Sequence, residues 1–394
     1  MRKKNLLFLQ SGGPTAVINA SLFGFLKAAS QNDSIGEIYG SKYGIEGVLN
    51  GDFLNFKDVK EEDIALLSQT PDMFLGSSRK NLSSDFSNPD YSKILSVLKR
   101  FSIDGLFING GNDSMLTASR LFEFFKMKGE RINVLGIPKT IDNDLFGFDH
   151  TLGYGSAALH VLSSVKCVAI DGLSYKEGKI QIIETMGRDT GWLAAASDLL
   201  PSPYHPDFIL IPELSFDVET FYKDLKTVYE KKHRALIVLS EGVNPCVPEE
   251  KDPFGHENLE GAGNHWARLI KEKLGYKSRV TILSSPMRSD PVLASGTDVD
   301  EAIKTGEVAF NYFQSGLEGV MPSFKCVSNN PYSIAYSPIP LKEVGGAIRY
   351  MPKEFLKDYR QMNPSFLDYL KPLLSDRELK KDSFGLFLSS KSYL

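Results

Sequence analysis

Short apolar runs rich in β-branched residues alternate along this chain with longer segments of helical periodicity, and this alternation constrains the fold more than any other feature. Parallel strands need a crossover connection, usually a helix, so the alternation indicates βαβ units around a parallel sheet. We predict strands over residues 5–10, 104–109, 133–138, 179–184, 208–211, 235–240 and 279–284. The predicted helices cover residues 16–30, 114–128, 155–171, 190–198, 217–232, 262–273 and 298–315. The chain is therefore expected to be an α/β protein.

Length and charge narrow the class further. At 394 residues the chain can form two domains or one large α/β unit. The net charge of −4 makes nucleic acid and acidic membrane surfaces poor partners, so an anionic ligand needs a local cluster of cations. The N-terminus lacks the features of a signal peptide, and no apolar run approaches the roughly 20 residues of a membrane span. Three distant cysteines without metal-ligand spacing are typical of a reduced compartment, which predicts a cytoplasmic protein.

Glycine-rich and acidic turns follow the first two predicted strands, and in a doubly wound sheet the carboxyl ends of strands form the ligand crevice. The turn SGGPT at residues 11–15 places Gly13 where the backbone can approach a ligand, and the helix that follows favours an anion. It matches neither a P-loop nor a dinucleotide fingerprint, and such turns also occur for packing reasons alone. In the turn NGGNDS at residues 109–114, Asp113 either caps a helix or faces a phosphate and a metal.

The sequence PKTIDND at residues 138–144 is the strongest constellation of candidate catalytic groups. Asp142, Asp144 and the ammonium of Lys139 lie within six residues at a strand end, whereas an Asx turn needs only one such group. The two carboxylates are predicted to supply a general base and a metal- or water-facing partner.

Cationic and acidic residues also follow the later strands. In the turn ETMGRDTGW at residues 184–192, Arg188 either pairs with Asp189 or grips a sugar phosphate. Taken singly, the remaining candidates are more often surface charges than ligand contacts, but as a set they supply the local cations that an acidic chain needs. They are Arg79, Glu241, Arg279 and Arg288.

These turns, in this order and with these intervals, resemble the phosphofructokinase family from residue 11 to about residue 316. Within the family, Asp113 and Lys139 resemble the pyrophosphate-dependent branch, because ATP-using members carry glycine or another small residue at these positions. A carboxylate at Asp113 would repel the α-phosphate of a nucleotide, while Lys139 would stabilise the transferring phosphoryl group. The resemblance implies a reversible transfer from pyrophosphate to fructose 6-phosphate with Mg2+ as cofactor.

The resemblance also assigns roles to the residues of the matching turns. Asp142 is implied to accept the proton of the attacking sugar hydroxyl. The other implied catalytic groups are Lys139, Asp113 and Asp144, and the implied donor-binding residues are Gly13, Arg79, Asp113 and Lys139. The implied contacts of the sugar phosphate are Thr140, Ile141, Asp142, Met186, Gly187, Arg188, Glu241 and Arg288. Lys179 and Arg279 match substrate-binding positions that usually reach in from a neighbouring subunit, which implies a homodimer or homotetramer.

Three positions depart from the family pattern. Asn112 stands where the family usually places an aspartate that faces Mg2+, so it is the candidate metal residue. Ser285 stands where ATP-type members carry a histidine toward the sugar 6-phosphate. Phe23 replaces the effector-binding arginine of regulated bacterial members, although Lys27 keeps a cation nearby, so we expect no regulation by nucleotides or phosphoenolpyruvate.

By resemblance, we expect two doubly wound, Rossmann-like α/β domains with the active site in the cleft between them. The phosphoryl-donor domain is expected to cover residues 1–150 plus about 286–335. The sugar-phosphate-binding domain is expected to cover residues 151–285 plus about 336–394.

Three other functions fit part of the pattern. An ATP-dependent 6-phosphofructokinase would use Asp113 and Lys139 in other roles. A catalytically weak paralogue that binds sugar phosphate as a sensor or partner subunit is suggested by Asn112 and Ser285, but such a protein has no need of the base Asp142. A nicotinamide-dependent oxidoreductase also uses a parallel sheet, but this chain lacks its glycine fingerprint.

Overall fold

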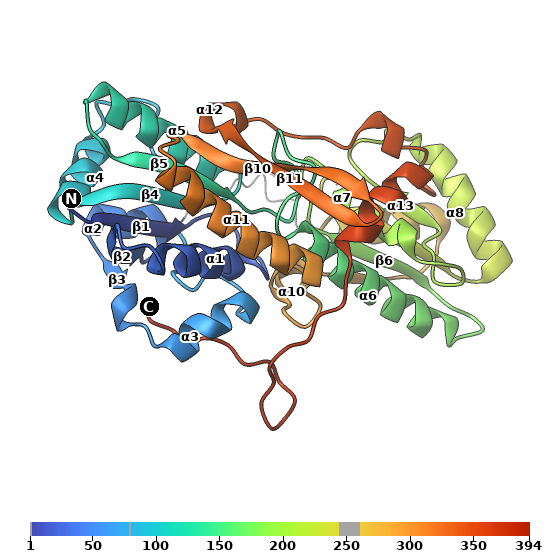
Figure 1. The fold of residues 1–394 in the computed structure, drawn as a ribbon. Coiled ribbons are helices and arrows are strands. Elements are labelled where there is room, and N and C mark those ends of the chain that lie inside the picture. The colour runs from blue at the N-terminus through green and yellow to red at the C-terminus, as the bar shows by residue number, and fades with distance from the viewer. Residues whose placement is uncertain (1, 79, 244–260) are drawn as a thin grey trace. The chain divides into compact units, whose positions relative to one another are not determined.

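The structure is a computed structural model that describes residues 2–78, 80–243 and 261–394 of the chain (Figure 1). Its elements divide between two compact units, each built around a parallel sheet. The first unit contains Met1–Gly153, Ala294–Arg349 and Ser375–Leu394, and the second contains Tyr154–Leu293 and Tyr350–Leu374. Each unit is therefore assembled from separated stretches of the sequence.

The first unit contains a five-stranded sheet in the order β3-β2-β1-β4-β5. Its strands are β1 (Lys4–Gln10), β2 (Ile35–Ser41), β3 (Phe53–Asn55), β4 (Ile103–Gly110) and β5 (Asn133–Pro138). All neighbours are parallel except β3, which pairs antiparallel with β2 at the edge of the sheet. Because β2 lies on one side of β1 and β4 on the other, the strand order reverses at the end of β1, where open α/β sheets bind their ligands.

Both faces of this sheet are apolar because successive residues of a strand point to opposite sides. Leu7 and Leu9 of β1 pack in one buried cluster, which includes residues of α2, α4 and α5. Leu6 and Phe8 pack in a second cluster, where Phe25 of α1 and residues of α11 cover them. The helices of this unit are α1 (Ile18–Ser30), α2 (Gly44–Asn50), α3 (Glu61–Leu66), α4 (Pro89–Arg100), α5 (Asn112–Met127), α11 (Gly296–Gln314) and α12 (Leu341–Val344), with the 3-10 turns η1 (Phe56–Asp58) and η2 (Leu67–Gln69).

Two later segments join the first unit through hydrogen bonds to its other parts. The strand β11 (Tyr332–Pro340) pairs antiparallel with β10 (Val320–Asn329), and β10 packs against β5. The C-terminal segment, drawn red in Figure 1, is held by Gln69, whose side-chain amide donates to the carbonyls of Lys380 at 3.1 Å and Leu388 at 2.7 Å. These contacts explain why residues 336–349 and 375–394 lie in the first unit, whereas we expected them in the second domain.

The second unit contains a four-stranded, wholly parallel sheet in the order β7-β8-β6-β9. Ile182 and Ile237 of the central strands pack in a buried cluster with Phe221 of α8 and Trp266 of α9. Its strands are β6 (Ile180–Thr185), β7 (Phe208–Leu210), β8 (Ala235–Ser240) and β9 (Ser278–Ile282). Its helices are α6 (Tyr154–Leu173), α7 (Trp192–Ala196), α8 (Val218–Lys232), α9 (Ala262–Leu274), α10 (Ser284–Ser289) and α13 (Pro364–Leu370), with the 3-10 turns η3 (Ser197–Leu199), η4 (Lys353–Phe355) and η5 (Lys371–Leu373).

The helix α6 corrects the expectation that no apolar run approaches the length of a membrane span. It has 20 residues with a mean hydropathy of 1.3 over its most apolar window, which is enough for a span by length and composition. Lys166 and Asp171 interrupt its apolar sequence, and Ala158, Val161 and Val165 are fully buried. Because α6 packs against β6 and α7, these contacts are those of a core helix.

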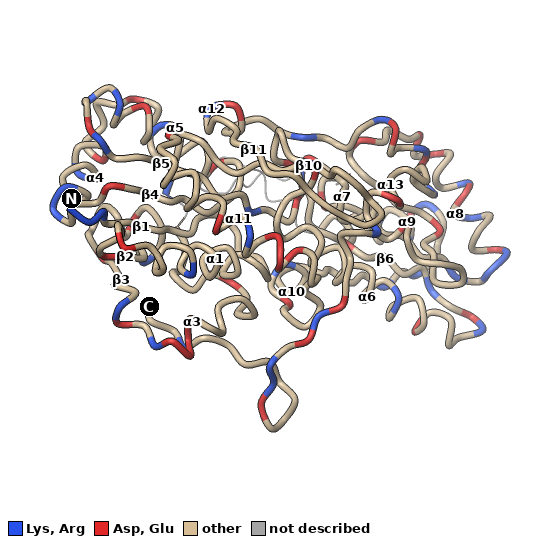
Figure 2. The backbone as a smooth tube through the Cα atoms, in the orientation of Figure 1, with Lys and Arg blue, Asp and Glu red and all other residues tan. Residues whose placement is uncertain are grey.

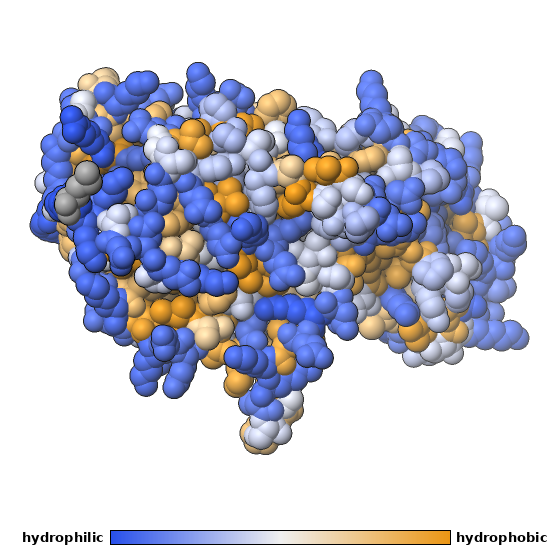
Figure 3. Space-filling view, in the orientation of Figure 1, coloured by the Kyte–Doolittle hydropathy of each residue, from blue (hydrophilic) through white to orange (hydrophobic). Residues whose placement is uncertain are grey.

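Charged residues of both signs are interspersed along the chain, as Figure 2 shows. The face drawn in Figure 3 is mainly hydrophilic, with smaller apolar areas between the charged side chains. This mixture agrees with the small net charge of −4. Cys167 is exposed and Cys326 is half-buried, both as free thiols, while Cys246 lies outside the described residues.

Candidate active site

Three of the predicted turns meet at the carboxyl edge of the first unit's sheet. They follow β1, β4 and β5, which are neighbours in that sheet. The backbone N–H of Ser11 donates to the carbonyl of Asn109 over 2.9 Å, and the backbone N–H of Lys139 donates to the carbonyl of Gly110 over 3.0 Å. The turn after β4 is thereby held next to the turn after β1 and next to the turn after β5.

Lys139 also joins the turns after β1 and β5 through its side chain. It is only 3% exposed, and its ammonium group donates to the carbonyl oxygen of Gly13. Gly12 adopts φ +81°, and a Cβ there would lie 3.4 Å from Lys139 Nζ. A fixed positive charge therefore stands beside the exposed backbone of a glycine turn, which is suited to an anionic ligand. Ser77 donates to the carbonyl of Gly12 at 2.9 Å, whereas the candidate Arg79 lies outside the described residues.

Asp142 stands on a turn whose backbone is fixed from several sides. Its carboxyl group is half-buried, and its backbone N–H donates to Thr140 Oγ1 at 3.1 Å. The Thr140 hydroxyl in turn lies 3.4 Å from Asp142 Oδ2. Asn143 adopts φ +56°, in the left-handed region, and its carbonyl accepts a hydrogen bond from the Arg349 guanidinium at 3.0 Å. An ordered carboxylate that solvent can reach is suited to act as a general base.

The other candidates of this turn have different surroundings. Asp144 is half-buried, and its backbone carbonyl accepts from the N–H of Arg349 at 2.7 Å. Ile141 is buried, and a Cβ at Gly153 would lie 3.3 Å from its side chain. Ile141 is therefore part of the packing that supports the turn.

Asn112 and Asp113 occupy the first turn of α5, directly after β4. Asp113 is exposed, and a carboxylate at a helix N-terminus is favoured electrostatically. The side-chain amide of Asn112 donates to the carbonyl of Ala347 at 2.7 Å, and its oxygen accepts from the N–H of Gly346. An aspartate could not donate the first of these bonds. Both polar groups of the candidate metal residue thus hold the turn at 346–347.

The three turns carry single oxygen ligands and do not form a complete set of protein ligands for a metal ion. Within residues 2–78, 80–243 and 261–394, no group of three or more His, Cys, Asp or Glu side chains is placed to hold a metal ion. Mg2+ typically binds through one or two carboxylates together with waters and substrate phosphates, so a single exposed carboxylate such as Asp113 fits that mode of binding.

In the second unit, the turns after β6 and β8 are locked together. The N–H of Gly187 donates to Glu241 Oε1 at 3.2 Å, and the N–H of Gly242 donates to the carbonyl of Gly187 at 3.1 Å. The Ser240 hydroxyl donates to the same carbonyl. Gly187 adopts φ +125°, and a Cβ there would lie 2.4 Å from the carbonyl of Thr190, so no larger residue fits. The turn that carries Arg188 is thereby held in one shape.

Two arginines near the carboxyl ends of β6 and β9 have buried donors without protein partners. Arg188 follows the half-buried Met186 at the end of β6, and Arg288 lies on α10 after β9. The Nε atom of each is buried and finds no hydrogen-bond partner in the part of the chain that the structure describes. Among the described residues, the alternative pairing of Arg188 with Asp189 is not formed, and Asp189 is exposed. Because an unpaired buried donor is unfavourable, both sites are suited to an anionic ligand, and arginine pairs well with phosphate.

The comparison with protein families agrees with this geometry. The family model described as phosphofructokinase matches residues 5–309, most of the chain. The chain belongs to the phosphofructokinase family. A pyrophosphate–fructose 6-phosphate 1-phosphotransferase from Xanthomonas campestris is 35% identical over 369 residues, which cover 91% of this chain and 88% of that protein. A sulfofructose kinase from Alkalicoccus urumqiensis is 32% identical over 359 residues, 90% of this chain and 92% of that kinase.

Solved structures of phosphofructokinases share the fold. The crystal structure of a pyrophosphate-dependent phosphofructokinase from Nitrosospira multiformis matches with a TM-score of 0.88 and 32% identity, covering 99% of this chain and 97% of that one. The family that the turns predicted, and the α/β fold class that the alternation of strands and helices predicted, are therefore confirmed.

Lys179 and Arg279, which we predicted to bind the sugar phosphate, lie at the other end of the second sheet. Lys179 is exposed and directly precedes β6, and Arg279 near the start of β9 pairs with Asp171 at 3.2 Å. Arg188 follows the opposite end of β6. This strand has six residues and spans roughly 20 Å at about 3.3 Å per residue. Within one chain, Lys179 and Arg279 therefore do not join Arg188, and a contribution from a neighbouring subunit stays a prediction.

Sequence reasoning missed the buried residues that support these phosphofructokinase turns. Glu184 is buried at the end of β6, and its carboxylate accepts from the N–H groups of Gly261 at 2.9 Å and Gly263 at 2.7 Å, where α9 begins. A carboxylate directly after the apolar pair Ile182 and Ile183, in a strand predicted to be buried, was the available signal. The buried pair of His150 and Glu301 gave no signal, because the two residues are 151 positions apart.

Proposed function

We propose that this chain transfers a phosphoryl group from pyrophosphate to fructose 6-phosphate, giving fructose 1,6-bisphosphate and phosphate. The observation that carries the proposal is the buried ammonium of Lys139 on the carbonyl of Gly13, beside the exposed glycine turn. A fixed cation at this position stabilises charge on a transferring phosphoryl group. The exposed carboxylate of Asp113 disfavours the α-phosphate of a nucleotide, which supports pyrophosphate over ATP.

In this reaction Asp142 is the general base. Its carboxylate accepts the proton of the attacking sugar hydroxyl as the hydroxyl oxygen forms a bond to one phosphorus of pyrophosphate. The bridging P–O bond breaks, and inorganic phosphate leaves. Thr140 fixes the base through the backbone N–H of Asp142, which accounts for the ordered geometry of the turn. We assign Asp144, the second carboxylate of this turn, the metal- or water-facing role predicted for the partner of the base.

The second unit binds the sugar phosphate. Arg188 and Arg288 each bring a buried guanidinium donor that lacks a protein partner among the described residues, and a phosphate completes it. Met186, Gly187 and Glu241 complete this group, and the bond between Glu241 and the N–H of Gly187 orients the carboxylate.

Mg2+ is the cofactor that we assign to the reaction. Asp113 would hold it together with water and pyrophosphate oxygens, and the ion would neutralise charge on the pyrophosphate. Asn112 is a weaker candidate, because its amide already holds the turn at 346–347.

We further propose that the enzyme is a cytoplasmic homodimer or homotetramer without regulation by nucleotides. The location of Lys179 and Arg279 away from Arg188 supports a site that a second subunit completes. Phe23 packs against an apolar cluster instead of offering a cation to an effector. Activity that stays hyperbolic in titrations with ADP and phosphoenolpyruvate supports this view, and a sigmoidal curve shifted by either compound contradicts it.

The test is an assay of the purified chain with fructose 6-phosphate, Mg2+ and pyrophosphate, coupled to detection of the bisphosphate. Product formation is the expected result, and the reverse reaction from bisphosphate and phosphate should run readily. Replacing the acceptor by sulfofructose asks whether the chain shares the acceptor of its sulfofructose kinase relative. Folded protein that binds fructose 6-phosphate in calorimetry but forms no product would instead identify a binding paralogue.

A further inference from the structure

The extended segment of residues 150–153 runs beside the turn that carries Asp142. The backbone N–H of Thr140 donates to the carbonyl of Leu152 at 3.1 Å, and the Thr151 hydroxyl donates to the carbonyl of Thr140 at 2.8 Å. The N–H of Thr151 donates to the side-chain oxygen of the buried Asn143 at 2.9 Å. Thr140, which contacts Asp142, is therefore held through both of its backbone polar groups by this one segment.

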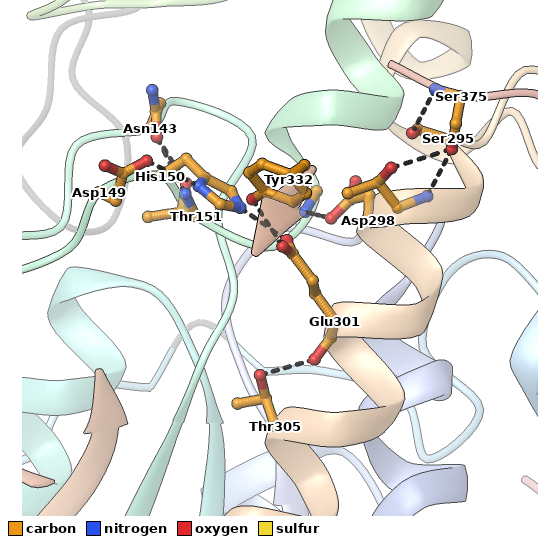
Figure 4. A network of polar contacts seen from close by, with 12 residues as sticks. Asn143, Asp149, His150, Thr151, Ser295, Asp298, Glu301, Thr305, Tyr332 and Ser375 are labelled. Atoms are coloured by element: carbon orange, nitrogen blue, oxygen red, sulfur yellow. Dashed lines mark hydrogen bonds and ion pairs between the residues drawn. The ribbon is translucent and has the colours of Figure 1, made fainter. Parts of the chain in front are cut away.

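The helix α11 holds both ends of the 150–153 segment (Figure 4). At one end, His150 Nε2 lies 2.6 Å from Glu301 Oε2. At the other end, the N–H of Gly153 donates to Asp298 Oδ1 at 2.9 Å. Asp298 and Glu301 are three positions apart on α11, so they lie on the same face of that helix. The position of the segment, and with it the position of Thr140, is therefore tied to α11.

The ion pair of His150 and Glu301 is buried and completed by neighbouring polar groups. His150 is 2% exposed and Glu301 is 7% exposed. The second imidazole nitrogen of His150 lies 3.1 Å from Asp149 Oδ1, and Tyr332 on β11 donates its hydroxyl to Glu301 Oε1 at 2.7 Å. The imidazole is too deeply buried to contact a substrate, so any role in catalysis is indirect.

The charge of His150 follows from its surroundings. The carboxylates of Glu301 and Asp149 outweigh the effect of burial and raise the pKa of His150 to about 9. The titratable and charged groups around the pair are Asp149 and Arg349 from the segments flanking the turn, Glu301 from α11, Cys326 from β10, and Tyr332 and Tyr336 from β11. The imidazolium is thus the form that pairs with Glu301 at neutral pH.

We propose that His150, Glu301 and Tyr332 are positioning residues for Asp142, acting through Thr151, Asn143 and Thr140. They set the orientation of the base and do not touch the substrate. The catalytic part of this inference rests on the proposed function, in which Asp142 is the base. The structural part, that these residues order the turn at 139–144, holds for any reaction at this site.

The kinetic test uses two mild variants, Tyr332→Phe and Glu301→Gln, assayed well below their melting temperatures. A displaced base slows the chemical step, so we expect kcat to fall by about tenfold to a hundredfold with KM for fructose 6-phosphate unchanged. In the parent, kcat should fall as the pH rises through about 9, and Glu301→Gln should move this alkaline limb to lower pH. Unchanged kcat together with an unchanged alkaline limb in both folded variants overturns the inference.

The matched control is His205→Asn, which breaks another histidine–carboxylate pair. His205 Nε2 lies 2.8 Å from Asp198 Oδ1 in the second unit, whereas the turn at 139–144 belongs to the first unit. This variant should lose thermal stability but keep the parent kcat and the alkaline limb. An equal kcat loss in His205→Asn would assign the effect to general destabilisation and overturn the inference.

A second readout does not depend on activity. Hydrogen exchange followed by mass spectrometry should show faster exchange of the peptide covering residues 139–145 in Tyr332→Phe and Glu301→Gln, and parent rates there in His205→Asn. Unchanged exchange of this peptide overturns the inference, whatever the enzyme's substrate. A parent chain without pyrophosphate-dependent activity overturns the proposed function instead, and faster exchange in the variants would still support the ordering role.

Discussion

The ammonium group of Lys139 donates a hydrogen bond to the carbonyl oxygen of Gly13, and this contact joins the turn after β5 to the turn after β1. Lys139 is only 3% exposed, and burying an ammonium group costs free energy unless partners compensate for its lost hydration. This buried positive charge lies next to the exposed backbone of Gly12 and Gly13, which is suited to bind an anion.

Replacing Lys139 by methionine tests the role of this cation. Methionine keeps much of the side-chain length but removes the charge, so we expect kcat with pyrophosphate to fall by about 100- to 1,000-fold. Stability should change little or increase, because the buried charge is gone. Steady-state kinetics and thermal melting measure the two effects. Lys93→Met, at an exposed position on α4, is the control, and an equal loss of activity there would contradict the assignment.

Arg188→Met tests the sugar-phosphate site. Loss of charge-assisted hydrogen bonds of about 1.5–3 kcal/mol should raise KM for fructose 6-phosphate by about 10- to 100-fold. Calorimetric titration with fructose 6-phosphate should show the same loss of affinity. Arg360→Met removes an arginine that pairs with Asp224 at 2.8 Å in the same unit, and it should leave KM unchanged. If Arg188→Met binds fructose 6-phosphate as the parent does, Arg188 is not a ligand.

Asn112→Asp tests whether this residue is a structural clamp. The variant loses the hydrogen bond to the carbonyl of Ala347 and places a carboxylate beside that oxygen, so the free energy of unfolding should fall by about 1–3 kcal/mol. Denaturant titration measures the change. Asn32→Asp is the matched control, because Asn32 uses its side-chain oxygen to accept from Ser34, which a carboxylate also does. Equal stability of Asn112→Asp and the parent would contradict the clamp.

The ion pair of His150 and Glu301 predicts how stability depends on pH. The pKa of His150 is raised from 6.5 in the unfolded chain to about 9 in the folded one. The contribution of the charged His150 to the free energy of unfolding is therefore fully present below pH 6.5 and is lost as the pH rises through about 9. Replacing His150 by glutamine should destabilise the protein more at pH 6.5 than at pH 10, as judged by denaturant titration at both values. An equal loss at the two pH values would show that the charge of His150 does not contribute.

The strands buried on both faces could be predicted well from the sequence. Residues 134–138 and 235–239 contain no polar side chain, and β5 and β8 form around them with the expected bounds. Among the elements that were missed, β3 has only three residues, and β11 alternates exposed with half-buried positions over most of its length. Residues after 374 form no helix or strand, and hydrogen bonds with Gln69 and Thr70 hold them in place.

The turns of the candidate site could be predicted because each one directly follows a buried strand. Their meeting at one edge follows from the parallel sheet, which brings Lys139 to Gly13 across 126 positions. The contacts that hold these turns in place could not be predicted, since no local pattern links His150 to Glu301 or Asn112 to the turn at 346–347. Such contacts depend on how helices and returning segments pack on the sheet.

The most direct measurement compares kcat/KM for pyrophosphate and for ATP, at saturating fructose 6-phosphate and Mg2+, in the parent chain and in Asp113→Gly. The roles given to Asp113 and Lys139 predict that the parent uses pyrophosphate and that ATP supports little or no turnover. Asp113→Gly should gain measurable activity with ATP without becoming an efficient ATP enzyme, because Lys139 remains. A parent chain that prefers ATP, or an Asp113→Gly variant with no change in donor preference, would contradict this assignment of the donor site.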